Sequence, residues 1–172
     1  MKSKIVVFAI MILITAAQAA IAEPAVSGRL RKSGDRTSFY TGAGYFIPYE
    51  GDLGGAAMYA AGVETRRGGE ALFVDVSFAR TAPDGAPLAQ NVNNYIAQFG
   101  YRKSIGSGYS IGAGAQSQQM DFGFGIKRSR LMPFVFAEKG LPGKLLLRVS
   151  ASGRGSKGSV NMGGYSLMVI YK

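Results

Sequence analysis

Turn-forming residues recur along this chain at a regular spacing, and this spacing limits the folds that it can adopt. Stretches rich in glycine, proline and charged residues lie at 50–55, 66–70, 82–87, 106–108, 121–125, 139–144 and 153–159. They separate eight segments of about ten residues with strand-like composition, at 37–48, 55–66, 71–81, 92–103, 108–118, 128–138, 144–153 and 161–171. No segment has a sustained helical period. The spacing therefore predicts an all-β fold.

The faces of these strands favour a membrane barrel. In segment 144–153 one face carries Leu145, Leu147, Val149 and Ala151, and the other carries Leu146, Arg148, Ser150 and Ser152. A soluble barrel would turn the apolar face inward and carry many lysines and glutamates outside. Here the second face carries mostly small side chains and few charges, which suits the crowded interior of a narrow barrel. We therefore predict an eight-stranded antiparallel up-and-down transmembrane β-barrel, with a soluble barrel as the alternative.

The first residues of the chain indicate export. Lys2 and Lys4 precede an apolar run from Ile5 to about Ala17, and small residues follow. A charged start, a short apolar core and a small-residue end are typical of a cleaved signal peptide. We predict a signal peptide at 1–22, a short polar segment at 23–36 and the barrel domain at 37–172. The exported part has 18 basic and 10 acidic residues, since two of the 20 basic residues precede the cleavage point.

In this architecture the chain resembles the small eight-stranded outer-membrane barrels, the class of OmpX and the membrane domain of OmpA. The resemblance covers Thr37 to Lys172 and lies in strand number, short alternate turns and tyrosines near the strand ends. It implies the outer membrane of a Gram-negative bacterium, insertion by the barrel-assembly machinery and contact with outer-membrane lipids. The periplasm or secretion is the alternative. The class usually ends in an aromatic residue, whereas here Tyr171 is followed by Lys172.

Composition argues against catalysis and metal binding. The enzymes among small outer-membrane barrels rely on histidine as a base, and this chain has no histidine and no cysteine. A calcium site built from carboxylates alone would need a dense acidic loop, which the sequence lacks. The glycine-rich stretches do not have phosphate-loop spacing. We expect no enzyme activity, no cofactor, no metal and no nucleic-acid partner.

Alternation predicts an ionic cluster inside the barrel. The charged residues on the inner faces are Glu64, Asp75, Arg102, Glu138 and Arg148. Because a buried charge without a partner is costly, these residues should pair across the lumen. The third and seventh strands lie opposite each other in a ring of eight, so we expect Arg148 to pair with Asp75, with Glu64 or Glu138 as the alternative. The cluster is either a structural plug or a selectivity ring in a narrow ion pathway.

A second set of charges lies in the last two connections that are predicted to face outward. These basic residues are Lys127, Arg128, Arg130, Arg154 and Lys157. Arginine and lysine in such loops suit the phosphates of lipopolysaccharide or another anionic polymer, or they are simply solvated. We therefore expect a structural or surface-binding outer-membrane protein, acting as a monomer. The alternatives are a soluble barrel that binds a ligand or carbohydrate, and a narrow channel or accessory subunit of polysaccharide export.

Overall fold

The protein forms a closed antiparallel β-barrel. The computed structural model describes residues 35–51, 53–82, 91–157 and 160–172. The barrel strands are β1 (Asp35–Pro48), β2 (Ala56–Arg67), β3 (Glu70–Thr81), β4 (Val92–Gly106), β5 (Tyr109–Asp121), β6 (Lys127–Gly140), β7 (Leu145–Ser152) and β10 (Gly164–Tyr171). They close in the order β1-β10-β7-β6-β5-β4-β3-β2, and every pair is antiparallel. The all-β, eight-stranded up-and-down barrel predicted from the sequence is confirmed.

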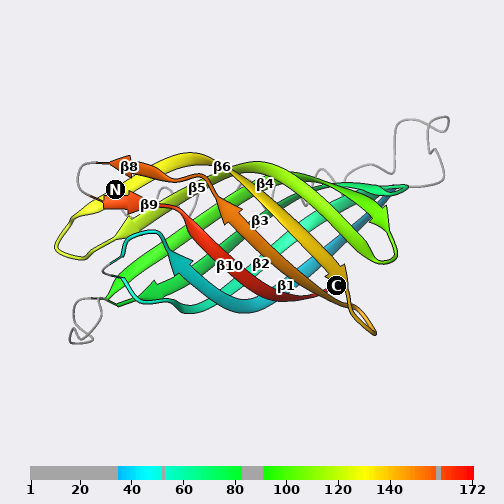
Figure 1. Cartoon of the computed structure of the whole chain (residues 1–172), viewed down its shortest axis with the longest axis horizontal. Coiled ribbons are helices and arrows are strands. Elements are labelled where there is room, and N and C mark those ends of the chain that lie inside the picture. Colours follow the sequence, from blue (N-terminus) through cyan, green and yellow to red (C-terminus); the bar gives the residue numbers. More distant parts are fainter. Residues whose placement is uncertain (1–34, 52, 83–90, 158–159) are drawn as a thin grey trace, which may run out of the picture.

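The two ends of the barrel differ in their connections. At one end, here called the turn end, β2–β3 and β4–β5 are joined by two residues each (68–69 and 107–108) and β6–β7 by four (141–144). The start of β1 and the C-terminus lie at this same end (Figure 1). At the opposite end, here called the loop end, the connections span 49–55, 82–91, 122–126 and 153–163. The short turns therefore alternate with longer connections around the ring.

The last connection contains structure that the sequence did not predict. Strands β8 (Gly155–Lys157) and β9 (Val160–Met162) form a small two-stranded sheet between β7 and β10. The segment predicted as one strand over 161–171 is therefore interrupted at Gly163. Its φ is 101°, a conformation that residues with a Cβ atom rarely adopt. The chain bends there, and the carbonyl of Gly163 accepts a hydrogen bond from the amide of Tyr49 at 3.0 Å.

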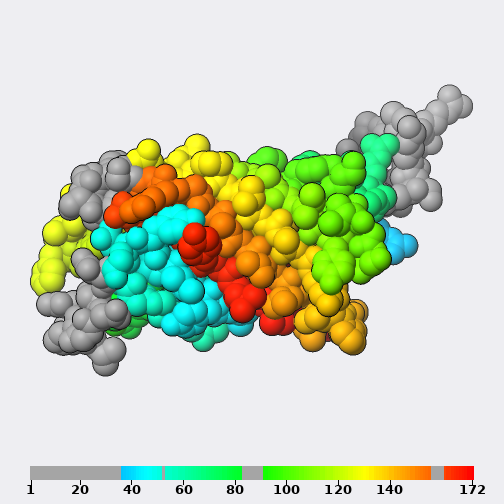
Figure 2. Space-filling model, in the orientation of Figure 1, coloured from blue at the N-terminus to red at the C-terminus, as the bar shows by residue number. Residues whose placement is uncertain are grey.

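Side chains alternate between the outer surface and the lumen in the predicted sense. Along β4, Tyr95, Phe99 and Tyr101 are exposed, while Asn94, Gln98 and Arg102 are buried. The outward side chains of β1, β10, β7 and β6 form a continuous wall in the space-filling view (Figure 2). In the described residues no helix is long and apolar enough to cross a membrane.

The lumen is filled by side chains from all around the ring. Aromatic rings occupy the turn-end half, where Phe73 packs edge-on against Phe134 and Phe136, at centroid distances of 6.2 and 5.3 Å. The loop-end half holds a second apolar cluster formed by Leu53, Val92, Met120, Met132 and Met162. An eight-stranded barrel is just wide enough for side chains to fill it. The core of the protein is therefore the barrel interior itself.

Candidate functional site

The outer face of β3 and β4 illustrates the surface that surrounds the barrel. Their outward-facing residues pair in register as Arg80–Asn93, Phe78–Tyr95, Val76–Ala97, Val74–Phe99, Leu72–Tyr101 and Glu70–Lys103. The four central pairs are apolar or aromatic, and the two end pairs carry charge or an amide. The rings of Phe78 and Tyr95 lie 5.3 Å apart near the loop end. This column therefore has an apolar centre with polar residues at both ends.

The two polar ends of this column lie about as far apart as the two edges of the apolar band of an outer-membrane barrel. From Asn93 to Lys103 the strand advances ten residues. At about 3.4 Å per residue and a tilt of about 40°, that is roughly 25 Å along the barrel axis. Exposed aromatic residues lie toward both edges of the band, at Tyr45, Tyr59, Tyr95 and Tyr165 near the loop end and at Phe39, Tyr101, Tyr109 and Tyr171 near the turn end. These are the aromatic girdles of a membrane-spanning barrel.

The turn-end half of the lumen holds an ionic cluster centred on Arg148. This guanidinium is 1% exposed, and its Nη1 donates to Asp75 Oδ2 at 3.0 Å. Its Nε and Nη2 both lie 2.8 Å from Glu138 Oε1. The guanidinium carbon also lies 4.8 Å from the ring centroid of Phe73 and 4.9 Å from that of Phe136. Arg148 thus links β3 to β6 and β7 across the lumen, and the pair with Asp75 expected from strand order is present.

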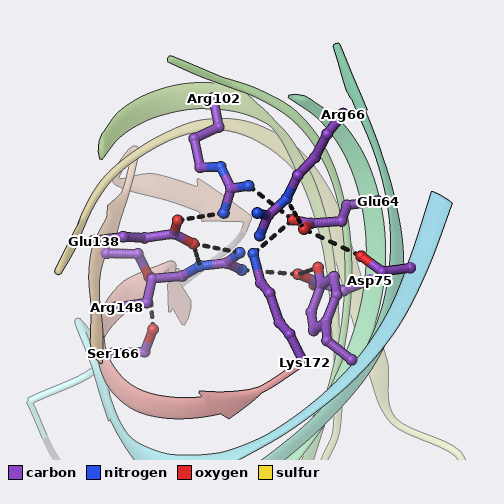
Figure 3. Close-up of polar contacts among 11 residues, drawn as sticks. Glu64, Arg66, Asp75, Arg102, Glu138, Arg148, Ser166 and Lys172 are labelled. Atoms are coloured by element: carbon purple, nitrogen blue, oxygen red, sulfur yellow. Dashed lines mark hydrogen bonds and ion pairs between the residues drawn. The ribbon is translucent and has the colours of Figure 1, made fainter. Parts of the chain in front are cut away.

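The remaining carboxylate, Glu64, binds three cations near the turn end. Arg102 Nη2 lies 3.0 Å from Glu64 Oε2, and Lys172 Nζ lies 2.7 Å from the same atom. Arg66 also contacts Glu64. Arg102 bridges the two halves of the cluster, because its Nη1 donates to Glu138 at 2.7 Å. Figure 3 shows these side chains converging on the barrel axis, with Arg148 and Lys172 near its centre.

The structure brings together all five residues that alternation placed inside the barrel. It also adds three that the sequence analysis did not assign, Tyr40, Arg66 and Lys172. The hydroxyl of Tyr40 donates to Asp75 Oδ2 at 2.8 Å. The alternation of strand faces could have identified Arg66 and Lys172. Arg66 follows Glu64 by two residues, and Lys172 follows the inward-facing Ile170 by two, so each shares the inward face of its neighbour.

Next to the ionic cluster, toward the loop end, the middle of the lumen holds polar, uncharged side chains. The side chains of Gln98 and Gln116 hydrogen-bond at 2.8 Å, and those of Ser150 and Ser166 at 2.6 Å. These four residues help to line a cavity of about 10 Å³. That volume is about what one water molecule needs.

The five basic residues predicted near the outer connections occupy different positions. Lys127 pairs with Asp121 Oδ2 at 3.1 Å. Arg128 and Arg130 are exposed, but they continue the inward-facing series of β6, and Arg130 packs next to Gly155 of β8. Arg154 is exposed in the last connection, and the side chain of Lys157 lies outside the described residues. Lys127 therefore faces outward, whereas Arg128 and Arg130 follow the inward series.

Metal-ligand chemistry is not provided by the part of the chain that the structure describes. No group of three or more carboxylate, histidine or cysteine side chains there could hold a metal ion. The three buried carboxylates of the ionic cluster are instead held by arginine and lysine. This arrangement suits a charge-compensated interior rather than a cation site.

A closed antiparallel barrel with an apolar outside and a polar, ionic inside has the fold of a small transmembrane β-barrel. Ail, the attachment invasion locus protein of Yersinia pestis, superposes with a TM-score of 0.50 and 14% identity, over 80% of this chain and 97% of that chain. Ail in complex with the heparin analogue sucrose octasulfate gives a TM-score of 0.47, 17% identity and the same coverage. Neisserial surface protein A gives a TM-score of 0.48 and 15% identity, over 80% of this chain and 99% of that chain. At 14% identity and a TM-score of 0.50, the likeness to Ail supports the barrel fold and nothing beyond the fold.

Sequence comparisons add no closer relative. No protein-family model matches the chain. A comparison with curated proteins gives no match either.

Proposed function

We propose that this protein is a monomeric outer-membrane barrel of a Gram-negative bacterium, with a structural or surface-binding role. The observation that carries the proposal is the column of outward residues on β3 and β4, because its polar ends lie about as far apart as the two edges of the apolar band of an outer-membrane barrel. A soluble barrel would expose this face to water, with residues such as Phe99 (55% exposed) and Leu72 (52%) unprotected. The predicted signal peptide would direct export of the chain, and the barrel-assembly machinery would then insert the barrel into the outer membrane.

The turn end faces the periplasm in this proposal, and the loop end faces outward. Outer-membrane barrels have short periplasmic turns and longer outer loops, and both described ends of the chain lie at the turn end. The lumen acts as a plug rather than as a channel. Its support is the Arg148-centred cluster together with the Gln and Ser side chains that fill the middle of the barrel.

An epitope tag tests this orientation. Inserted after Phe124, at the tip of the β5–β6 connection, it should be accessible to antibody on intact cells, because Phe124 is 99% exposed at the loop end. A tag inserted after Gly69, in the β2–β3 turn, should be accessible only after the outer membrane is permeabilised. Both proteins should fractionate with the outer membrane and migrate faster on unboiled gels. Surface labelling at Gly69 with protection at Phe124 would reverse the proposed orientation.

The outer basic residues are the proposed contact with anionic polymers, with lipopolysaccharide as the first candidate. Replacing Lys127, Arg128, Arg130, Arg154 and Lys157 together by Gln should weaken binding of purified lipopolysaccharide, most strongly at low salt. Each lost charge removes an ionic contact with phosphate that counter-ions would otherwise screen. Binding to the detergent-solubilised protein can be measured by fluorescence titration at several salt concentrations.

The matched control changes five exposed cations at the opposite end of the barrel. These are Arg36, Arg67, Lys103, Lys139 and Lys144, and replacing them by Gln removes the same net charge. The control should bind lipopolysaccharide more tightly than the loop-end variant at every salt concentration. If both variants lose the same affinity for lipopolysaccharide, net charge alone drives the association. If both variants bind lipopolysaccharide as tightly as the wild-type protein does, the loop-end cations are not the contact.

A further inference from the structure

A cluster of hydrogen-bonding side chains lies on the outside of the barrel where β3, β4 and β5 reach the loop end. Arg80 pairs in register with Asn93, and Tyr95 pairs with Gln119 on the other side of β4. All four belong to the outward-facing series of their strands. Arg80 and Tyr95 are exposed, and Asn93 and Gln119 are partly exposed. The cluster therefore combines a guanidinium, two amides and a phenol on one surface.

Arg80 differs from the other basic residues of the loop end. Among the strand residues that the structure describes, Arg80 and Lys127 are the cations that face outward there. Lys127 is paired with Asp121, whereas no described carboxylate lies within ion-pair distance of Arg80. Arg128 and Arg130 follow the inward series of β6. Arg80 thus has no ion-pair partner among the described residues, and it belongs to the outward-facing series of β3.

The height of the cluster places it at the level of lipid headgroups. Its Tyr95 ring lies 5.3 Å from the ring of Phe78, and the apolar residues of the band follow below this aromatic pair. A side chain immediately beyond an aromatic girdle is at the interface between the acyl chains and the headgroups. An anionic headgroup in the adjacent leaflet would neutralise Arg80 there.

We propose that Arg80, Asn93, Tyr95 and Gln119 form a lateral site for the phosphorylated sugar headgroup of an outer-leaflet glycolipid. A guanidinium offers two parallel donors to a phosphate. The amides of Asn93 and Gln119 can donate to and accept from sugar hydroxyls, and the Tyr95 ring offers a flat apolar face. A glycerophospholipid headgroup would leave most of these groups unused. The site rests on the proposed function, because it requires the loop end to face the glycolipid leaflet.

The test uses purified full-length protein in detergent, titrated with lipopolysaccharide that carries lipid A and core sugars. Arg80→Gln should raise the Kd roughly tenfold or more, because it removes hydrogen bonds from a charged group to phosphate. Asn93→Ala should weaken binding by a smaller factor, and Arg80→Lys should recover part of the affinity. The control Lys103→Gln removes a cation from the opposite end of the same column and should leave the Kd unchanged. The shift in unboiled gel mobility verifies folding of each variant.

Each result decides a separate question. An unchanged Kd for Arg80→Gln, while the five-residue loop-end variant loses binding, would overturn the lateral site and leave the proposed function standing. Absence of lipopolysaccharide binding by the wild-type protein would overturn both. Arg80→Gln should have little effect on binding to phosphatidylglycerol vesicles. An equal loss on those vesicles would overturn the glycolipid as the occupant and make Arg80 a general phosphate contact.

Discussion

Replacing Arg148 by Leu should destabilise the protein by about 3–5 kcal/mol, the range measured when one partner of a buried ion pair is removed. Arg148 is 1% exposed and binds both Asp75 and Glu138. Its removal leaves Asp75 without a cation in a fully buried position, and it also removes the contacts with Phe73 and Phe136. The measurement is the free energy of unfolding in urea, in detergent micelles or lipid, followed by the shift in gel mobility.

A double-mutant cycle isolates the pair. Adding Asp75→Asn to Arg148→Leu should restore part of the loss, because the asparagine is neutral and its carbonyl can still accept the hydrogen bond from Tyr40. If the two losses simply add, Arg148 and Asp75 are not energetically coupled. If Arg148→Leu stabilises the barrel, burying the Arg148 charge costs more free energy than its ion pairs contribute.

Arg66→Leu is the matched control for the loss of a cation. The Arg66 side chain is 42% exposed, and Glu64 keeps Arg102 and Lys172 as partners when Arg66 is removed. An exposed ion pair contributes about 0–1 kcal/mol, so this variant should remain close to the wild type. A loss as large as that of Arg148→Leu would show that burial does not decide the contribution of each cation.

Gly114→Val should prevent folding, or destabilise the barrel by about 3 kcal/mol or more. A Cβ atom at Gly114 would collide with the Phe99 carbonyl oxygen and lie 2.6 Å from Gly100 Cα, both in the backbone of the neighbouring strand. It would also lie 2.8 Å from the Phe134 ring. Backbone atoms cannot move aside by changing rotamer, so strands β4 and β5 would have to separate.

Ala113→Val tests the same strand one residue away. Ala113 faces outward and is exposed, so a larger apolar side chain enters the outer band. This variant should keep the fast-migrating unboiled band and unfold at about the wild-type urea concentration, while Gly114→Val should lose that band. Normal folding of Gly114→Val would contradict the close approach of β4 and β5 at this position.

The ionic cluster shows how far alternation predicts a site in a barrel. A period of two assigns each strand residue to one face, and strand number places β3 and β7 opposite each other. Together with the similar distances of Asp75 and Arg148 from their turns, these rules predict the pair. They do not rank the other partners, because the heights of Glu64 and Glu138 depend on tilt and shear. In the structure Glu138 shares Arg148 and Arg102, while Glu64 is held by Arg102, Lys172 and Arg66.

The amino-acid sequence by itself determined the all-β fold, the strand number, and the faces of the strands, because turn residues and alternation are local properties of the chain. It could not show that the last connection contains the β8–β9 hairpin, since three-residue strands have too little pattern to detect. Nor could it show that Lys127 pairs with Asp121 while Arg80 has no ion-pair partner among the described residues. Those outcomes depend on the register between strands and the closure of the ring, which bring together side chains that no local spacing relates.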